Sequence, residues 1–169
     1  MAAQEFLPPP DWHASLPGVV VAAAGLIRDG AGRVLVVKPN YRDHWTLPGG
    51  ICEFSEAPHA GCARELAEEL GLPLPVGRML AVDWQLPLRI YGPQARPAVF
   101  FVFDCGVLHL LSDVRLQEEE LDDCQFADEA DLAALLAETT VARVRAAIGS
   151  LSSGCAQYVP GLDEAERTR

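Results

Sequence analysis

The sequence predicts a single layered domain of the α/β or α+β class. Its 169 residues are an ordinary length for one domain, and 50% hydrophobic residues are enough to form the core. Strand-like apolar runs come first and helical segments are interleaved with them, an order typical of layered folds. We expect one domain over residues 18–149, an N-terminal arm over 1–17 and a disordered tail over 150–169.

The first strands are predicted to form a buried hairpin. Residues 19–27 are a continuous apolar run, a second run follows at 34–37, and an Asp-Gly pair between them is a turn signal. A short strand is expected at 45–47, because a Pro-Gly-Gly segment follows and would stop it.

Helices and further strands follow. The helix expected over 57–70 has Pro58 in its first turn and a glycine and a proline just past its end, which are start and stop signals. The remaining expected elements are strands at 78–85 and 98–105 and helices at 128–136 and 139–148, the first of these helices capped by Asp128 or Asp131.

The formal net charge of -11 is concentrated in two segments. Residues 53–69 hold five acidic residues against one arginine, and residues 118–131 hold eight acidic residues and no basic one. Surfaces for duplex DNA or anionic lipid need clustered lysine and arginine, so neither a nucleic-acid polymer nor a membrane is expected as a partner. Acidic segments are instead suited to binding cations.

The cysteines and the N-terminus favour a cytoplasmic protein. The spacing of the five cysteines matches neither a metal-binding pair nor a compact disulfide framework, so reduced thiols are expected. The N-terminus lacks a basic stretch followed by an apolar one. The longest apolar run has nine residues, which is about half the length of a membrane-spanning helix.

Three carboxylates share one face of the helix expected over 57–70. Glu65, Glu68 and Glu69 fall within about 100° of one another, and leucine and alanine occupy the opposite face. An ordinary solvated acidic face is one explanation. A metal site is favoured instead, because the preceding Pro-Gly-Gly segment would bring bare backbone close to the acids and Mg²⁺ binds carboxylates together with substrate phosphates. We expect this face to be solvent-exposed.

The same residues belong to a longer pattern that resembles the Nudix box. Its nine specified positions are all matched, over 23 residues, by Gly50, Glu56, Arg64, Glu65, Leu66, Glu68, Glu69, Gly71 and Leu72. The resemblance implies an α/β/α sandwich with a mixed β-sheet. It also implies a metal-dependent hydrolase that cleaves the pyrophosphate linkage of a nucleoside diphosphate linked to another moiety.

The resemblance further implies roles for single residues. The carboxylates of Glu65, Glu68 and Glu69 would hold Mg²⁺ or Mn²⁺, and the Gly49 carbonyl would complete the set of ligands. Glu56 and Arg64 would brace the loop onto the helix and orient these carboxylates.

The resemblance also implies one further acidic residue from a late loop. Glu118, Glu119 and Glu120 stand in that region, and Glu120 is favoured. Either Glu65 or Glu120 would serve as the general base that activates the attacking water.

Residues outside the box would bind the rest of the substrate. The candidates are Lys38, Arg42, Arg89 and Arg96 for the phosphates and Trp84 for stacking on a base. An isolated surface charge explains each of these cations equally well. Pro87 stands fifteen residues past the box, as in subfamilies that cleave ADP-ribose-like compounds, while nucleoside triphosphates and nucleotide sugars stay open as substrates.

Three other functions remain as alternatives. A catalytically silent Nudix-like domain that senses a nucleotide would be free to lose carboxylates, and this chain retains all three. A Nudix-related isoprenoid diphosphate isomerase would need a catalytic cysteine, for which Cys52 and Cys105 are available. An acidic protein-interaction module would explain residues 118–131 but not the box. Because dimers are frequent in the family, a homodimer is also an option.

Overall fold

The computed structural model describes residue 12, residues 15–87, residue 92 and residues 95–161. Its strands are β1 (Val20–Arg28), β2 (Val34–Pro39), β3 (Gly49–Ile51), β4 (Met79–Gln85), β5 (Ala98–Val107), β6 (Leu121–Ala127) and β7 (Gln157–Val159). Its helices are α2 (Pro58–Leu70), α3 (Glu129–Leu135), α4 (Glu138–Ser153) and the short 3₁₀ helix η2 (Leu111–Asp113). Most of the predicted N-terminal arm lies outside the described residues.

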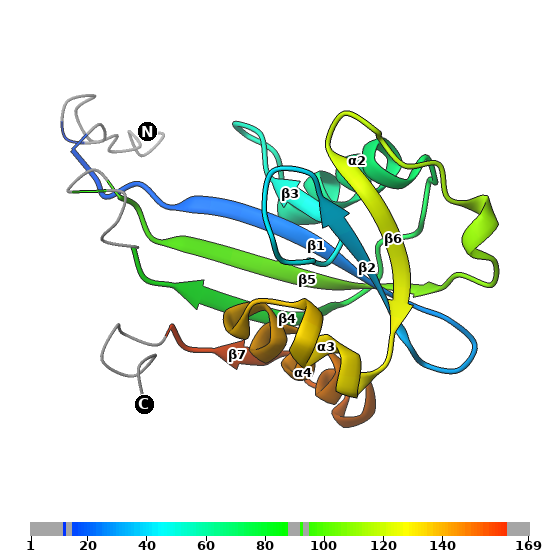
Figure 1. Cartoon of the computed structure of the whole chain (residues 1–169). Helices are drawn as coiled ribbons and strands as arrows, with labels where there is room; N and C mark the ends of the chain where they lie inside the picture. The colour runs from blue at the N-terminus through cyan, green and yellow to red at the C-terminus, as the bar shows by residue number, and fades with distance from the viewer. Residues whose placement is uncertain (1–11, 13–14, 88–91, 93–94, 162–169) are drawn as a thin grey trace, which may run out of the picture.

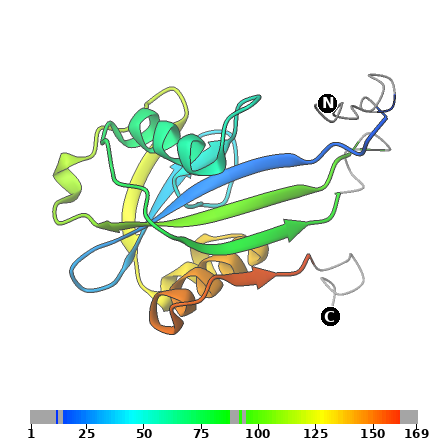
Figure 2. The ribbon, with the colours of Figure 1, turned by 180° about the vertical axis from the view of Figure 1, so that it is seen from behind.

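The strands form one mixed sheet between two helical layers. The order along the sheet is β6-β2-β1-β5-β4-β7, and β3 pairs separately with β1. The pairs β1 with β5 and β4 with β7 are parallel, and the other pairs are antiparallel. Figures 1 and 2 show α2 on one face of the sheet and α3 with α4 on the other. The predicted α/β/α sandwich with a mixed sheet is therefore confirmed.

The central strand β1 is buried on both faces, which explains its continuous apolar run. Successive side chains of a strand point to opposite faces. Leu26 belongs to the core under α3 and α4, together with Leu132 and Val144. Ile27 belongs to the core under α2, together with Leu66. The predicted hairpin of β1 with β2 is confirmed, with antiparallel pairing that places Arg28 opposite Val34.

Helix α2 lies close against β1. A side chain at Gly25 would come within 2.9 Å of the Cys105 sulfur and 3.0 Å of a Leu66 methyl carbon, so only glycine permits this approach. The helix begins at Pro58 and ends where Gly71 adopts the left-handed conformation, as its start and stop signals predicted. Its apolar face is thereby fixed on the sheet, and its acidic face is turned toward β3.

The short strand predicted at 45–47 is wrong. Trp45 and Thr46 form only isolated bridges, and the strand that follows is β3, Gly49–Ile51. β3 forms at the glycines because Gly49 pairs with Ala24 of β1 at a separation that leaves no room for a side chain. The glycines that were expected to stop a strand instead let the chain pair closely with β1.

The acidic segment at 118–131 includes a strand that the sequence did not predict. Residues 121–127 form β6, which pairs with β2 at the edge of the sheet, and Leu121 and Ala127 are buried while Asp122 and Asp123 are exposed. Asp128 caps α3 as predicted, accepting hydrogen bonds from the backbone N–H groups of Ala130 and Asp131.

The tail predicted from residue 150 is wrong for the residues that the structure describes. Helix α4 continues to Ser153, and β7 then pairs with β4. Ser150 is fully buried and its hydroxyl donates a hydrogen bond of 2.7 Å to the Cys155 carbonyl, which ties the helix end to the sheet. All five cysteines are free, and no helix in the described part of the chain has the length and apolar character to cross a membrane.

Candidate functional site

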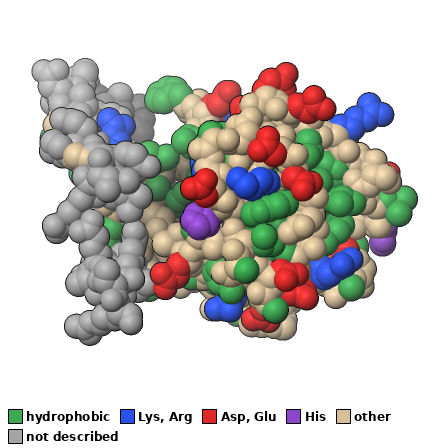
Figure 3. Space-filling model, viewed as in Figure 1, with side chains coloured by type: hydrophobic (Ala, Val, Ile, Leu, Met, Phe, Trp, Pro, Cys, Tyr) green, Lys and Arg blue, Asp and Glu red, His purple; other side chains and the backbone are tan. Residues whose placement is uncertain are grey.

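The two acidic segments of the sequence meet in space. The backbone N–H of Gln117, just before β6, donates to the Glu69 carbonyl of α2 at 3.1 Å, and the N–H of Arg115 donates to the Leu70 carbonyl at 2.8 Å. Figure 3 shows acidic side chains gathered along the border of the molecule where α2 and the loop before β6 lie. The start of the second acidic segment therefore adjoins the first, while its residues 129–131 belong to α3 on the other face of the sheet.

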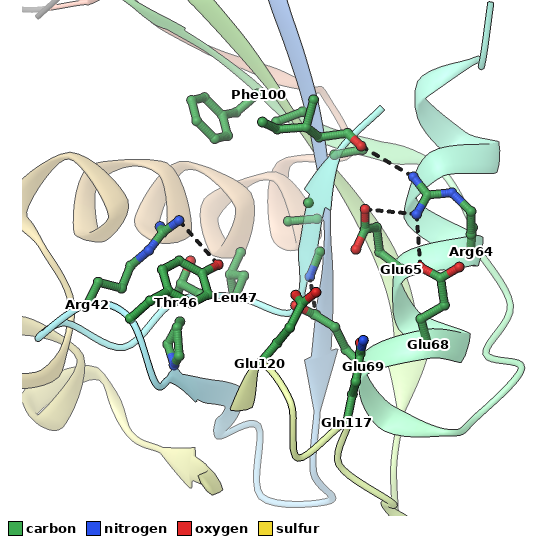
Figure 4. Close-up of a pocket in the computed structure, with 18 of the residues that line it drawn as sticks. Arg42, Thr46, Leu47, Arg64, Glu65, Glu68, Glu69, Phe100, Gln117 and Glu120 are labelled. Atoms are coloured by element: carbon green, nitrogen blue, oxygen red, sulfur yellow. Dashed lines mark hydrogen bonds and ion pairs between the residues drawn. The ribbon is translucent and has the colours of Figure 1, made fainter. Parts of the chain in front are cut away.

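A cavity of about 480 Å³ opens where the two segments adjoin. Four carboxylates line it, those of Glu65, Glu68 and Glu69 on α2 and that of Glu120 on the loop before β6. Other lining residues are Ala22, Ala23 and Ala24 of β1, Gly49 and Gly50 of β3, Arg42, Arg64, Phe100, Gln117 and Arg143. In the close-up, Glu120 lies beside Glu69, and Arg42 and Phe100 lie across the cavity from Glu68 (Figure 4). The predicted one-sided arrangement of the carboxylates is thus present.

Arg64 holds the acidic residues in place. Its guanidinium donates to both oxygens of Glu56 at 3.1 and 3.0 Å and to the Ile51 carbonyl at 3.2 Å. It also donates to Glu65 at 3.0 Å and to Glu68 at 2.9 Å. These contacts raise the pKa of Arg64, and the hydrogen bond from Arg64 holds the pKa of Glu56 below its ordinary value. Through these hydrogen bonds Arg64 links Glu56, in the loop before α2, to Glu65 on the helix.

Glu69 is buried, which corrects the expectation of a solvent-exposed face. Its side chain is only 6% exposed, and one carboxylate oxygen accepts a hydrogen bond of 2.7 Å from the Gly49 N–H. Burial raises the pKa of Glu69 to about 8, and the nearby charges of Glu65 and Glu120 raise it further while the Gly49 N–H opposes the rise. The prediction failed because α2 is covered at this point by β3 and by the segment before β6.

Gly49 and Gly50 allow the backbone to approach these carboxylates. Gly49 has φ of 137°, a conformation that residues with side chains rarely adopt. A side chain at Gly50 would come within 2.5 Å of a Glu65 carboxylate oxygen. The structure shows the N–H of Gly49, rather than its carbonyl, in contact with Glu69.

The donor set suits a hard divalent cation, although the carboxylates do not yet surround one point. In the described residues, no three potential ligand side chains are already arranged around a common centre, and Arg64 holds Glu65 and Glu68. Burial nevertheless raises the pKa of both Glu65 and Glu69. The charge of Glu120 adds to both rises, the charge of Glu68 adds to that of Glu65, and the charge of Glu65 adds to that of Glu69. A divalent cation would relieve this repulsion, and carboxylate oxygens are the ligands that Mg²⁺ prefers.

The other predicted substrate residues divide into three groups. Arg42 lines the cavity, and Arg96 lines a neighbouring one. Lys38 donates to the carbonyls of Pro39 and Arg42, and neither Lys38 nor Trp84 lines either cavity. Arg89 lies outside the described residues.

Among the lining residues that were not predicted from the sequence are Phe100, Gln117 and Arg143. Phe100 stands in an apolar strand and resembles an ordinary core residue. The one available signal for Arg143 was its position four residues before Ala147, on the side of the helix that is buried.

The raised pKa of Glu69 predicts how the stability of the metal-free protein depends on pH. The folded state keeps a proton on Glu69 up to about pH 8, whereas the unfolded state releases it above its ordinary pKa of 4.5. The stabilising contribution is therefore full below pH 4.5 and is lost as the pH rises to 8. In EDTA, we expect the free energy of unfolding of the natural protein to fall between pH 4.5 and 8. In Glu69→Gln we expect a smaller fall, with a difference between the two proteins on the order of 3 kcal/mol. Parallel curves for the two proteins in chemical denaturation would contradict this expectation.

Comparison with known proteins gives one family match and several relatives. The family model described as NUDIX domain matches residues 18–147. A MutT-like protein from Streptomyces ambofaciens is 34% identical over 102 residues, which is 60% of this chain and 56% of the relative. Diphosphoinositol polyphosphate phosphohydrolase 3-alpha from Mus musculus is 36% identical over 80 residues, or 47% of this chain and 44% of the relative.

The fold also matches solved structures. The crystal structure of a UDP-X diphosphatase superimposes with a TM-score of 0.66 and 25% identity, covering 86% of this chain and 68% of that one. The chain spans about half the length of these two relatives that it matches by sequence.

Proposed function

Because the chain belongs to the NUDIX domain family, we propose that it is a divalent-metal-dependent pyrophosphohydrolase of nucleoside diphosphates linked to another moiety. The observation that carries this proposal is the meeting of four carboxylates, Glu65, Glu68, Glu69 and Glu120, at one cavity. Candidate substrates are ADP-ribose-like compounds, nucleotide sugars and nucleoside triphosphates. The similar UDP-X diphosphatase acts, by its name, on such a linkage, whereas the similar diphosphoinositol polyphosphate phosphohydrolase acts, by its name, on a compound without a nucleoside.

Each group of residues supports one requirement of the reaction. Glu65, Glu68 and Glu69 would hold Mg²⁺ or Mn²⁺, which when bound supplies Lewis-acid stabilisation of the charge on the phosphates. Arg64 orients Glu65 and Glu68 through the hydrogen bonds described above. Glu120 is exposed, lines the cavity and faces Glu69, so its carboxylate is available to accept a proton from the attacking water.

The alternatives fit the structure less well. Cys52 and Cys105, which an isoprenoid diphosphate isomerase would need near the reaction, line neither cavity, and Cys105 is buried beneath α2. A silent nucleotide sensor has no need for a complete carboxylate set. An acidic interaction module does not account for residues 121–127, which form a sheet strand.

Product analysis tests the proposal directly. The purified chain is incubated with Mg²⁺ and a panel of ADP-ribose, nucleotide sugars and nucleoside triphosphates, and products are separated by ion-exchange chromatography. We expect nucleoside monophosphate to be released, and we expect EDTA to abolish its release. Tight nucleotide binding without turnover would favour the sensor, and turnover that persists in EDTA would contradict the proposed metal dependence.

Metal binding is also tested without turnover. If Mg²⁺ relieves the repulsion between the carboxylates, saturating Mg²⁺ at pH 8 stabilises the folded state by about 2.7 kcal/mol at one hundred times Kd, which is roughly 5–10 °C in Tm. We expect Glu69→Gln to lose most of this shift in thermal unfolding monitored by circular dichroism. The experiment uses about 10 mM Mg²⁺, which is above the millimolar range of weak metal sites. If the Tm of the natural protein does not change, the carboxylates on α2 do not bind the metal.

A further inference from the structure

Arg143 is a buried cation in the middle of α4. It is 6% exposed and lies on the same helix as the buried apolar residues Val141, Val144 and Ala147. Burial lowers the pKa of its guanidinium, and the charge of Asp83 opposes that change. A buried charge is costly unless it is paired, so the contacts of Arg143 indicate what the charge is for.

The contacts of Arg143 use only part of its hydrogen-bonding capacity. Its Nε donates to Asp83 at 2.8 Å, and Asp83, which is fully buried, also accepts from the Gln85 amide at 2.7 and 2.9 Å. The guanidinium carbon lies 3.7 Å from the centre of the Phe100 ring. Asp83 and Phe100 therefore fix the plane of the guanidinium. Within the described part of the chain, its two terminal nitrogens make no hydrogen bond.

Arg143 lines a second cavity as well as the first. The second cavity has a volume of about 880 Å³ and shares six lining residues with the first, which are Val20, Tyr41, Arg42, Thr46, Phe100 and Arg143. The two cavities therefore adjoin along one wall. Figure 4 shows Arg42 and Phe100 of this wall on the side of the first cavity away from Arg64.

The charge of the second cavity is opposite to that of the first. Among the described residues that line it are Arg42, Arg96 and Arg143, and none is Asp or Glu. Ala137, Thr139 and Thr140, at the N-terminus of the 16-residue helix α4, also line it, and no side chain caps that N-terminus. Helix N-termini carry partial positive charge and free N–H groups, which favour anions.

We propose that the second cavity binds an oxyanion, which is a phosphate or carboxylate group on the part of the substrate distant from the hydrolysed linkage. The two terminal nitrogens of Arg143 donate the hydrogen bonds to this group. The assignment rests on the proposed function and narrows its substrate class. A guanidinium matches the geometry of a carboxylate or phosphate, and two parallel hydrogen bonds of this kind are both strong and directional. The preferred substrates are diphosphates that carry a further negative charge away from the hydrolysed linkage, on either the nucleoside or the group linked to it.

Matched substrate pairs test this assignment. UDP-glucuronate and UDP-glucose differ by a carboxylate on the sugar, and ADP-ribose 2′-phosphate and ADP-ribose differ by a phosphate on the nucleoside. In at least one pair, we expect kcat/KM of the natural protein to be roughly tenfold or more higher for the substrate with the extra anion. The pair that shows the preference identifies whether the group is a carboxylate or a phosphate. Equal kcat/KM values within both pairs would overturn the proposal.

Substitution of Arg143 tests the residue itself. Arg143→Lys keeps the positive charge but loses the paired terminal nitrogens, and we expect it to lower the ratio of kcat/KM between the substrate with the extra anion and its partner at least fivefold. Arg145→Lys is the matched control, because Arg145 is on the same helix but exposed, 3.7 Å from Glu129. An equal loss on both members of a pair would show that Arg143 is only structural.

A second variant guards against loss of folding. Arg96 is exposed and lines only the second cavity, so Arg96→Gln is expected to preserve the fold and to lower the same preference roughly threefold. Thermal unfolding verifies that each variant is folded. If Arg143→Lys does not fold, an unchanged preference in Arg96→Gln overturns the proposal.

Binding without metal separates this proposal from the proposed function. If no diphosphate is hydrolysed in Mg²⁺, the proposed function fails while the oxyanion site is still open to test. In EDTA, calorimetric titration with UDP-glucuronate, UDP-glucose and the two ADP-ribose compounds is expected to show roughly fivefold tighter binding of one anionic member, and Arg143→Lys is expected to remove the difference. Equal affinities within both pairs overturn the oxyanion site regardless of turnover.

Discussion

Replacing Glu69 by glutamine is expected to lower kcat at least about a hundredfold, which corresponds to about 2.7 kcal/mol of lost transition-state stabilisation. Glutamine has the shape of glutamate and can still accept the 2.7 Å hydrogen bond from the Gly49 N–H through its carbonyl oxygen. It lacks the negative charge that a divalent cation requires. The loss is therefore expected in metal-dependent turnover and not in the fold, and it is measured as kcat at saturating Mg²⁺.

We expect Glu69→Gln to fold, because the structure shows that the carboxylate of Glu69 is buried. Burial penalises the charge of Glu69, so its removal stabilises the metal-free protein at neutral pH rather than leaving stability unchanged. Glu118→Gln is a matched control, because Glu118 is exposed in the same acidic segment and lines neither cavity. If Glu69→Gln retains more than about a tenth of kcat, the assignment of Glu69 to the metal is wrong. An equal loss in Glu118→Gln would mean that the general negative field, and not one ligand, supports turnover.

Local spacing was enough to place three of the four carboxylates of the candidate site on one helix face. Glu65, Glu68 and Glu69 lie on one face because α-helical geometry leaves no other arrangement, and the helix ends are marked by Pro58 and Gly71. The interleaved order of strands and helices also predicted the layers. These features depend on residues only a few positions apart, which is why a single sequence contains them.

Burial of Glu69 depends on contacts that are distant in sequence. β3 reaches it from 20 residues away through the Gly49 N–H, and Gln117 reaches its backbone carbonyl from the loop before β6. Helical periodicity specifies the direction in which a side chain points but not what covers it. The sequence therefore predicted correctly that the three carboxylates share one helix face. It predicted wrongly that the carboxylate of Glu69 is exposed to solvent.

The basic half of the proposed site could not be predicted for the same reason. Arg143 meets Asp83 across 60 residues and stacks on Phe100, and each of the three belongs to a different element. Read singly, they are a helix arginine, a strand aspartate and an apolar-strand phenylalanine. The helix predicted over 139–148 includes Arg143, but its periodicity does not specify that it packs on β4, which is the contact that brings Arg143 and Asp83 together.

The largest effect on stability is expected from Gly49→Ala. Gly49 has φ of 137°, and a side chain there would run into the Ala23 carbonyl oxygen and come within 2.6 Å of the Ala24 Cα, both on β1. Neither neighbour can move aside without breaking the pairing of β3 with β1. We expect a loss of about 3 kcal/mol or more in the free energy of unfolding, or roughly 6–12 °C in Tm, measured by urea denaturation and thermal scans.

Two other glycines separate the causes of this loss. Gly32 has φ of 84°, and a Cβ atom at this position would meet no other atom within 4 Å, so Gly32→Ala measures conformational strain alone, which is about 1 kcal/mol. Gly30 has the same open space without a positive φ, and Gly30→Ala is expected to stay within about 0.5 kcal/mol of the natural protein. If Gly49→Ala lowers the free energy of unfolding no more than Gly32→Ala does, close packing of β3 on β1 is not what positions the Gly49 N–H. If it costs more and also lowers kcat, the same contact that holds β3 against the sheet delivers the hydrogen bond to Glu69, and stability and activity depend on one backbone position.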